Sequence, residues 1–167
     1  MVFLVCALIA IGVLVFDLIS KYLVVLYNVD FVVIPTLLKF ELTYNTGAAF
    51  SMLGDKDWAR TFFIVLTTLV CLAILAVFIY LLLKKKKVSK WFTASFALIF
   101  AGAVGNLVDR IFLGYVRDFI FVFYETRIFP AIFNIADISL VVGVIMACFY
   151  LLFLDKDALF RKKKNAK

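Results

Sequence analysis

The sequence predicts a mainly α-helical integral membrane protein, with four transmembrane helices and a small sheet outside the membrane. Composition is the first observation behind this prediction. Of the 167 residues, 66% are hydrophobic and 17% are charged, whereas a typical soluble domain has about 25% charged residues. The mean hydropathy is +1.13. A soluble fold of this size leaves about 30% of its chain's surface in water. Such an apolar composition therefore favours a protein that is surrounded by lipid.

Four long apolar segments are the second observation. They cover residues of about 2–26, 61–83, 91–112 and 135–154. Each is long enough to cross about 30 Å of hydrocarbon, because a helix rises about 1.5 Å per residue. The length of the chain suits a single membrane domain over residues 1–167.

Two basic clusters, Lys84–Lys90 and Lys156–Lys167, are the third observation, and they predict orientation. Basic loops stay in the cytoplasm, so both clusters and both termini are expected there. Residues of about 27–60 and 113–134 are then expected outside. Because both clusters border apolar segments, we interpret them as topogenic signals and expect no nucleic-acid partner.

The loop over residues of about 27–60 has the pattern of a β-rich insertion. Phe31–Ile34 and Leu38–Tyr44 resemble strands, and we expect them to form a small sheet resting on the outer membrane surface. Asp55–Arg60 is typical of a helix start, with Trp58 placed at the interface. In the second outer loop, the short apolar stretch Phe119–Phe123 is interpreted as a strand or an interfacial segment.

The inventory of reactive side chains excludes several kinds of chemistry. The chain contains no histidine, which excludes Ser-His triads and zinc sites built on histidine ligands. Cys6, Cys71 and Cys148 each lie in an apolar run without the spacing of a metal motif. We therefore expect free thiols, no metal and no cofactor.

Polar residues from three predicted helices fall at one depth, near the outer membrane surface. Charged groups inside a membrane are costly, so they mark ion pairs or functional sites. Asp17 and Lys21 are four residues apart with the acid first, the favourable order for an ion pair. A structural pair and a chemical role both remain open for them. The residues of this layer are Asp17, Lys21, Asn106, Asp109, Arg110, Asn134 and Asp137.

Asp118 and Asp137 form a candidate carboxylate pair. Asp118 lies in the outer loop that follows the third helix, and Asp137 lies in the first turn of the fourth. Alone, Asp137 would be explained by the helix dipole. Two carboxyl groups in one site cannot both ionise cheaply, so one holds a proton while the other is charged. Such a pair can activate water and polarise a carbonyl without a histidine, a metal or a covalent intermediate.

Five short motifs, in order along the chain, resemble the bacterial lipoprotein signal peptidases, the signal peptidase II family of membrane aspartyl proteases. They are Asp17–Lys21, Asn45–Ser51, Gly105–Arg110, Val116–Phe119 and Phe133–Asp137. The resemblance implies that Asp118 and Asp137 are the catalytic dyad. It implies supporting or substrate-binding roles for Asp17, Lys21, Asn45, Gly47, Asn106, Asp109, Arg110 and Asn134.

The resemblance also implies a substrate, a location and a fold. The substrate would be a prolipoprotein signal peptide with a diacylglyceryl-cysteine, cleaved before that cysteine in the bacterial plasma (inner) membrane. Membrane lipids and globomycin-like cyclic peptide inhibitors are the other implied partners, and a monomer is expected. The implied fold has four transmembrane helices, an outer β-cradle and a short outer interfacial helix.

Three other classes make different demands on the sequence. A proton-coupled transporter needs polar groups across the full membrane depth, but the cytoplasmic halves of the predicted helices are apolar. A Ser-Lys peptidase needs the two side chains together, whereas Ser20 and Lys21 are adjacent and point to different helix faces. Ser51 and Ser139 lie near the outer layer with no lysine beside them. A purely structural protein gives no reason for the outer acids and asparagines to coincide.

Overall fold

The computed structural model describes residues 2–47, 58–84, 89–125 and 131–154. Its helices are α1 (Val2–Leu26), α2 (Ala59–Leu83), α3 (Lys90–Phe112) and α4 (Ile135–Phe149), and α4 continues as the π-helical turn η2 (Tyr150–Leu154). Its strands are β1 (Asp30–Ile34), β2 (Leu38–Asn45), β3 (Val116–Val122) and β4 (Ala131–Phe133). Within these ranges, four helices are long and apolar enough to cross a membrane, counting α4 together with η2, which confirms the predicted class.

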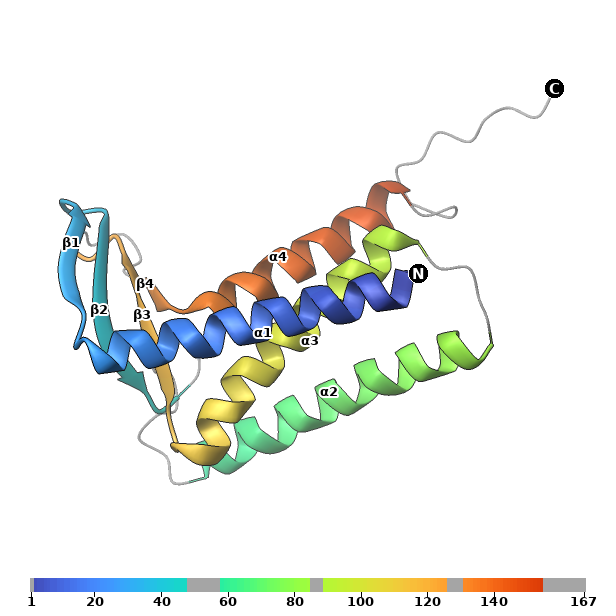
Figure 1. The fold of residues 1–167 in the computed structure, drawn as a ribbon, viewed down its shortest axis with the longest axis horizontal. Coiled ribbons are helices and arrows are strands. Elements are labelled where there is room, and N and C mark those ends of the chain that lie inside the picture. The colour runs from blue at the N-terminus through green and yellow to red at the C-terminus, as the bar shows by residue number, and fades with distance from the viewer. Residues whose placement is uncertain (1, 48–57, 85–88, 126–130, 155–167) are drawn as a thin grey trace.

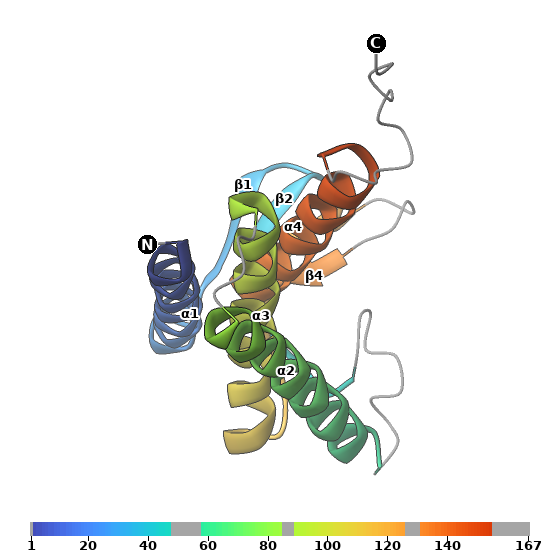
Figure 2. The ribbon, with the colours of Figure 1, turned by 90° about the vertical axis from the view of Figure 1, so that its right-hand side faces the viewer.

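The helix α3 is the centre of the helical part. It packs against α1, α2 and α4, and Figure 2 shows α1 and α2 on opposite sides of it. The strands lie together at one end of the helices, which we call the sheet end (Figure 1). The C-termini of α1 and α3 and the N-termini of α2 and α4 reach that end. Residues far apart in sequence therefore meet there.

The sheet joins the two predicted outer loops. Its strands pair antiparallel in the order β1-β2-β3-β4, so β3 is an interior strand between β2 and β4. The small sheet predicted from Phe31–Ile34 and Leu38–Tyr44 is confirmed, with these segments as β1 and β2, and Phe119–Phe123 largely falls in β3. Trp58 stands exposed directly before α2. Of the predicted helix start Asp55–Arg60, residues 55–57 lie outside the described ranges, and α2 begins at Ala59.

Glycines on α3 bring its backbone close to neighbouring helices. A Cβ atom at Gly102 would overlap the carbonyl oxygen of Ala136 and the side chain of Leu140 on α4. A Cβ atom at Gly105 would overlap the carboxylate of Asp17 on α1. Close approach of this kind supplies packing contacts between helices that lipid surrounds. It also lets polar side chains of α1, α3 and α4 reach one another.

Replacing Gly102 should loosen the contact between α3 and α4. We expect Gly102→Ala to lower the free energy of unfolding by about 1–3 kcal/mol, because the added methyl group meets backbone that must move. Thermal unfolding in detergent would measure the change. Gly12→Ala is the matched control, since nothing lies within 4 Å of that position and alanine favours a helix by up to about 1 kcal/mol over glycine. Equal midpoints for the two variants would contradict the packing argument.

Candidate active site

A buried lysine links α1 to α3 at the sheet end. The Lys21 side chain is fully buried, and its Nζ lies 2.8 Å from Asp17 Oδ2 and 3.6 Å from Asp109 Oδ2. It also donates a hydrogen bond of 3.0 Å to Asn106 Oδ1. The predicted Asp17–Lys21 ion pair is thus present, and Asp109 extends it. Asp17 Oδ1 accepts from the Ala136 N–H at 2.9 Å, which ties the first turn of α4 to α1.

The side-chain amide of Asn106 connects this lysine to Asp137. Its Oδ1 accepts hydrogen bonds from Lys21 Nζ and from Asn134 Nδ2, the latter at 3.1 Å. An ammonium can only donate, so the amide oxygen must face Lys21 and the amide nitrogen must face away. Nδ2 then donates to Asp137 Oδ1 at 2.7 Å. Lys21 therefore sets the direction in which Asn106 contacts Asp137.

Asn134 bridges the two candidate catalytic acids. It is the N-cap of α4 and forms a capping box with Asp137, an arrangement that satisfies free N–H groups at a helix start. Its N–H donates to Asp137 Oδ2 at 3.1 Å, and its Oδ1 accepts from the Asp137 N–H at 3.0 Å. Its Nδ2 donates to Asp118 Oδ1 at 2.6 Å. One capping residue thus holds both carboxyl groups.

Asp118 occupies an interior strand and is buried. It lies on β3 with 3% of its surface exposed, and its Oδ2 accepts from Asn45 Nδ2 at 2.9 Å. Burial raises the pKa of Asp118 to about 6, and the negative charge of Asp137 acts in the same direction. Hydrogen bonds from Asn45 and Asn134 favour the charged form and oppose the shift. Asp118 can therefore hold a proton at higher pH than an ordinary aspartate.

Arg117 is a site residue that the sequence did not predict. Its Nη2 lies 2.6 Å from Asp109 Oδ1 and its Nε donates to Asp109 Oδ2 at 3.2 Å, which makes a bidentate pair. The backbone N–H of Arg117 donates to the same carboxylate at 3.0 Å. Because Asp118 is the next residue, this clamp fixes the strand that carries it. In the sequence, the only signal for this role of Arg117 is an acid, Asp109, near the end of the preceding helix.

Arg110 joins the Asn45–Gly47 turn to α2 and α3. Its Nη2 donates to the Gly47 carbonyl at 3.2 Å, and its guanidinium carbon lies 5.4 Å from the centre of the Phe63 ring on α2. The Gly47 N–H donates to Asn45 Oδ1 at 3.0 Å, the side-chain-to-backbone contact of a tight turn. Asn45–Gly47 therefore forms a turn directly after β2.

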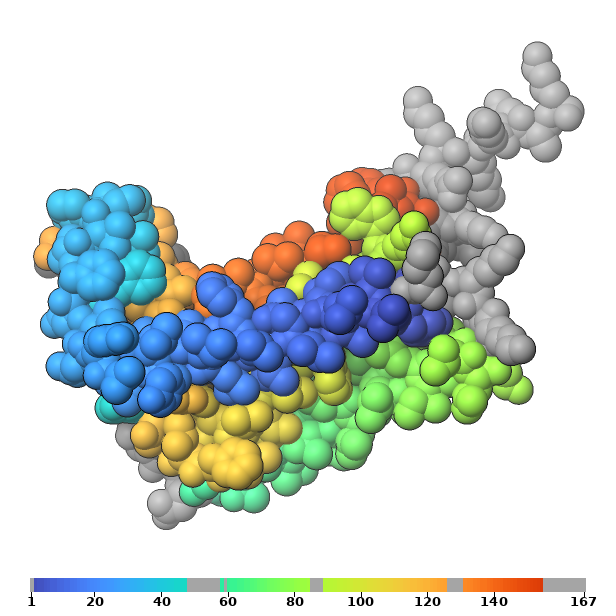
Figure 3. Space-filling model, in the orientation of Figure 1, coloured from blue at the N-terminus to red at the C-terminus, as the bar shows by residue number. Residues whose placement is uncertain are grey.

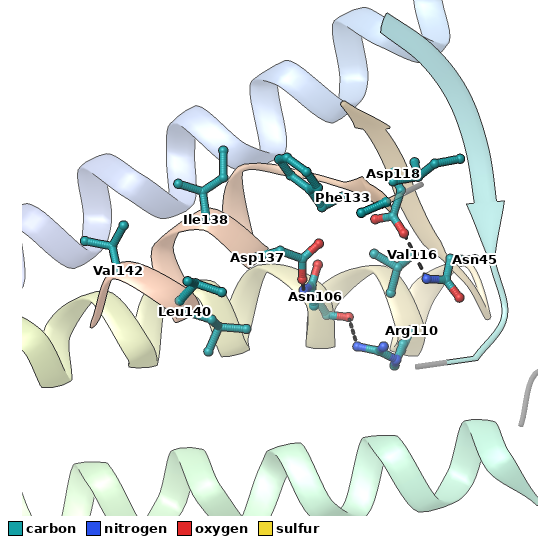
Figure 4. Close-up of a pocket in the computed structure, with 13 residues that line it drawn as sticks. Asn45, Asn106, Arg110, Val116, Asp118, Phe133, Asp137, Ile138, Leu140 and Val142 are labelled. Atoms are coloured by element: carbon teal, nitrogen blue, oxygen red, sulfur yellow. Dashed lines mark hydrogen bonds between the residues drawn. The ribbon is translucent and has the colours of Figure 1, made fainter. Parts of the chain in front are cut away.

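A cavity of about 550 Å³ opens beside these groups. Figure 3 shows the molecule hollowed along α4, between the sheet and the far ends of the helices. Figure 4 shows Asp118 and Asp137 at the polar end of the cavity, whose wall continues as apolar side chains of α4. Asp17, Lys21 and Asp109 are not among the residues that line the cavity. The lining residues are Asn45, Asn106, Arg110, Val116, Asp118, Ala131, Ile132, Phe133, Asp137, Ile138, Leu140, Val141 and Val142.

The serines near the site have other partners. Ser139 Oγ donates to the Leu98 carbonyl and Ser20 Oγ to the Asp17 carbonyl, both at 2.8 Å, so neither is activated by Lys21. Ser51 lies outside the described residues. Over the described ranges, the fully buried charged side chains all lie at the sheet end. That distribution does not provide the charged path across the membrane that a transporter requires.

Comparison with known proteins identifies first the class and then the family. A solved structure described as a bacterial membrane enzyme shares the fold, with a TM-score of 0.78, 36% identity and coverage of 98% of this chain and 94% of that one. The chain is a multi-pass membrane enzyme. The family model for signal peptidase II matches residues 9–153. The chain belongs to the signal peptidase II family and is an aspartic peptidase.

Individual relatives agree with this assignment. A lipoprotein signal peptidase of Pseudomonas paraeruginosa is 42% identical over 135 residues, which cover 80% of this chain and 73% of the relative. A lipoprotein signal peptidase of Acinetobacter baumannii is 44% identical over 127 residues, which cover 74% of this chain and 69% of the relative. The family resemblance of the five sequence motifs is therefore confirmed.

Loss of the Arg117 clamp should lower both stability and peptidase activity. We expect Arg117→Gln to reduce the free energy of unfolding by about 2 kcal/mol or more, because Asp109 loses its bidentate partner while staying buried. The stability of Arg117→Lys should lie between those of the wild type and Arg117→Gln, since lysine keeps the positive charge but cannot form the bidentate pair. Lys39→Gln is the control, because its ion pairs with Asp30 and Glu41 are more exposed, and exposed ion pairs contribute little to stability. Thermal unfolding and peptide-cleavage rates would separate these cases.

Proposed function

We propose that the protein removes signal peptides from prolipoproteins whose cysteine carries a diacylglyceryl group, and that it cleaves before that cysteine. One observation carries the proposal: Asn134 bridges the carboxyl groups of Asp118 and Asp137 at the polar end of an apolar cavity. Membership of the signal peptidase II family and relatives named lipoprotein signal peptidase support the substrate class.

The shape and polarity of the cavity suit such a substrate. A lipidated signal peptide has an apolar helix and acyl chains beside a polar peptide bond. The apolar wall for this helix and these acyl chains is formed by Ile138, Val141 and Val142 of α4. Asn45 and Arg110 offer polar groups at the other end for the peptide backbone. The bond to be cleaved would then lie beside the two aspartates.

In the proposed reaction, Asp137 acts as the base and Asp118 as the acid. Asp137 takes a proton from water while the oxygen adds to the scissile carbonyl carbon, and Asp118 gives its proton to the carbonyl oxygen. When the tetrahedral intermediate collapses, the C–N bond breaks, the leaving nitrogen takes the proton from Asp137, and the hydroxyl proton returns to Asp118. One water is consumed, and no metal or covalent intermediate is needed.

Charge balance among the ionisable groups at the sheet end supports a shared proton on the aspartate pair. The cations Lys21, Arg110 and Arg117 face four acids: Asp17, Asp109, Asp118 and Asp137. The cluster is neutral when one of the four acids is protonated. Burial raises the pKa of Asp118 to about 6, and Asp118 lies on β3 beside the cavity. A neutral cluster avoids the cost of an unpaired charge away from water.

The location and remaining partners are part of the same proposal. We place the protein in the bacterial plasma (inner) membrane as a monomer, with both termini in the cytoplasm and the sheet end at the outer face. The lysines Lys84 and Lys90, at the far end of α2 and α3, support this direction. Asp17, Lys21, Asn106, Asp109 and Asn134 orient the dyad, while Asn45, Gly47 and Arg110 contact substrate. Globomycin-like cyclic peptides are expected to occupy the same cavity.

Cleavage of a lipidated substrate tests the dyad directly. We expect Asp118→Asn and Asp137→Asn each to lower the cleavage rate by about a thousandfold or more, because each removes one half of the acid–base pair. The purified chain would be reconstituted with a diacylglyceryl-modified prolipoprotein, and the mass of the product would be followed. Asp30→Asn on β1 and Ser139→Ala are controls that should retain activity. Wild-type rates from either dyad variant would overturn the assignment.

The pH dependence provides a second test. The folded pKa of Asp118, about 6, exceeds its ordinary value of 3.8, so between those values the folded state binds more protons than the unfolded state. Asp118 therefore makes stability fall as pH rises from about 4 to about 6. We expect kcat/KM to decline above about pH 6 as free enzyme loses this proton. Asp118→Asn should remove the fall in stability between about pH 4 and pH 6. A pH–stability profile identical to that of the wild type would contradict the raised pKa of Asp118.

A further inference from the structure

A second cavity of about 280 Å³ lies at the end of the helices opposite the sheet. Three helices line it, and every lining residue is apolar, including Cys6 and Ala10 of α1, Ile79 and Leu82 of α2, and Ala97 of α3. The rings of Phe3 on α1 and Phe78 on α2 meet edge to face in its wall, with their centres 6.4 Å apart, and Figure 2 shows this end of α2 next to α3. We call this space the α1/α2 groove.

The length of the groove along the helices is somewhat less than the thickness of one membrane leaflet. On α1 its lining runs from Phe3 to Ala10, and on α2 from Leu75 to Leu82. Seven helical steps correspond to about 10 Å, compared with about 15 Å for the hydrocarbon of one leaflet. An apolar groove of that length beside lipid is suited to an acyl chain, because an unfilled space would forfeit the dispersion contacts of its walls.

Positive charge stands at the mouth of the groove. Lys84 follows Leu82 closely at the end of α2, and Lys90 begins α3; both are exposed. Over the described ranges, every aspartate and glutamate lies at the sheet end, and neither lysine has an ion-pair partner. The exposed Trp91 is adjacent to Lys90, and tryptophan is enriched where hydrocarbon meets headgroups. An acyl chain in the groove would thus place its headgroup beside Lys84 and Lys90.

We propose that the α1/α2 groove is a binding site for an anionic phospholipid, with one acyl chain in the groove and the phosphate headgroup on Lys84 and Lys90. This site is separate from the cavity that holds Asp118 and Asp137, and it does not depend on the peptidase reaction. Juxtamembrane lysines attract anionic lipids, and the groove converts that general attraction into a site for one molecule.

Native mass spectrometry of the full chain in detergent would test the site with two probes of identical acyl chains, phosphatidylglycerol and phosphatidylcholine. We expect one retained lipid, with phosphatidylglycerol preferred by at least about fivefold because of the lysines. Ala10→Phe should fill the groove and abolish retention of both lipids. Gly12→Phe is the matched control, since nothing lies within 4 Å of Gly12 on the same helix, and it should retain lipid as wild type does.

Charge variants test the headgroup separately. The double variant Lys84→Gln, Lys90→Gln should bind both lipids equally, whereas Lys39→Gln, which removes one charge at the sheet end, should keep the preference. Retained lipid in a folded Ala10→Phe protein, or an unchanged preference in the double variant, would overturn the proposal. Displacement of lipid by a second copy of the chain would also overturn it. Thermal unfolding and peptide cleavage confirm that each variant is folded.

Discussion

The burial of the Lys21 ammonium is the constraint on which the rest of the structure depends. A cation away from water is tolerated only when oxygen acceptors surround it, and here they come from Asp17, Asn106 and Asp109. These residues belong to α1 and α3, so the two helices must approach closely and in one register. Gly105 permits that approach, because a larger residue would overlap the Asp17 carboxylate.

The same network fixes the position of the sheet relative to the membrane helices. Asp17 holds the start of α4 through the Ala136 N–H, and Asp109 holds the start of β3 through Arg117. Asp137 and Asp118 lie next to these two anchors in sequence. Two carboxyl groups from different elements are therefore fixed by one buried ion cluster. Preorganisation of this kind is what the proposed acid–base chemistry requires, because reorganisation of the two carboxyl groups during the reaction would lower the rate.

The sequence was sufficient for features that depend on composition and periodicity. Long apolar runs predicted the helices, and depth counting along them placed Asp17, Lys21 and Asn106 in one layer. Other features depend on tertiary contacts and leave no local pattern. β4 has three residues, too few for alternation to be visible, and its pairing with β3 is decided by the fold. The role of Arg117 depends on a carboxylate eight residues earlier, across a turn.

The bridging role of Asn134 shows how a local signal can carry a second function. An asparagine before an apolar helix is typical of an N-cap, and Asn134 is the N-cap of α4. Capping uses its Oδ1 and its backbone N–H, which leaves Nδ2 to donate to Asp118. A serine or aspartate could cap the helix equally well, but neither has an amide N–H2 to offer. The demand for asparagine at this position therefore comes from the carboxyl pair rather than from the helix.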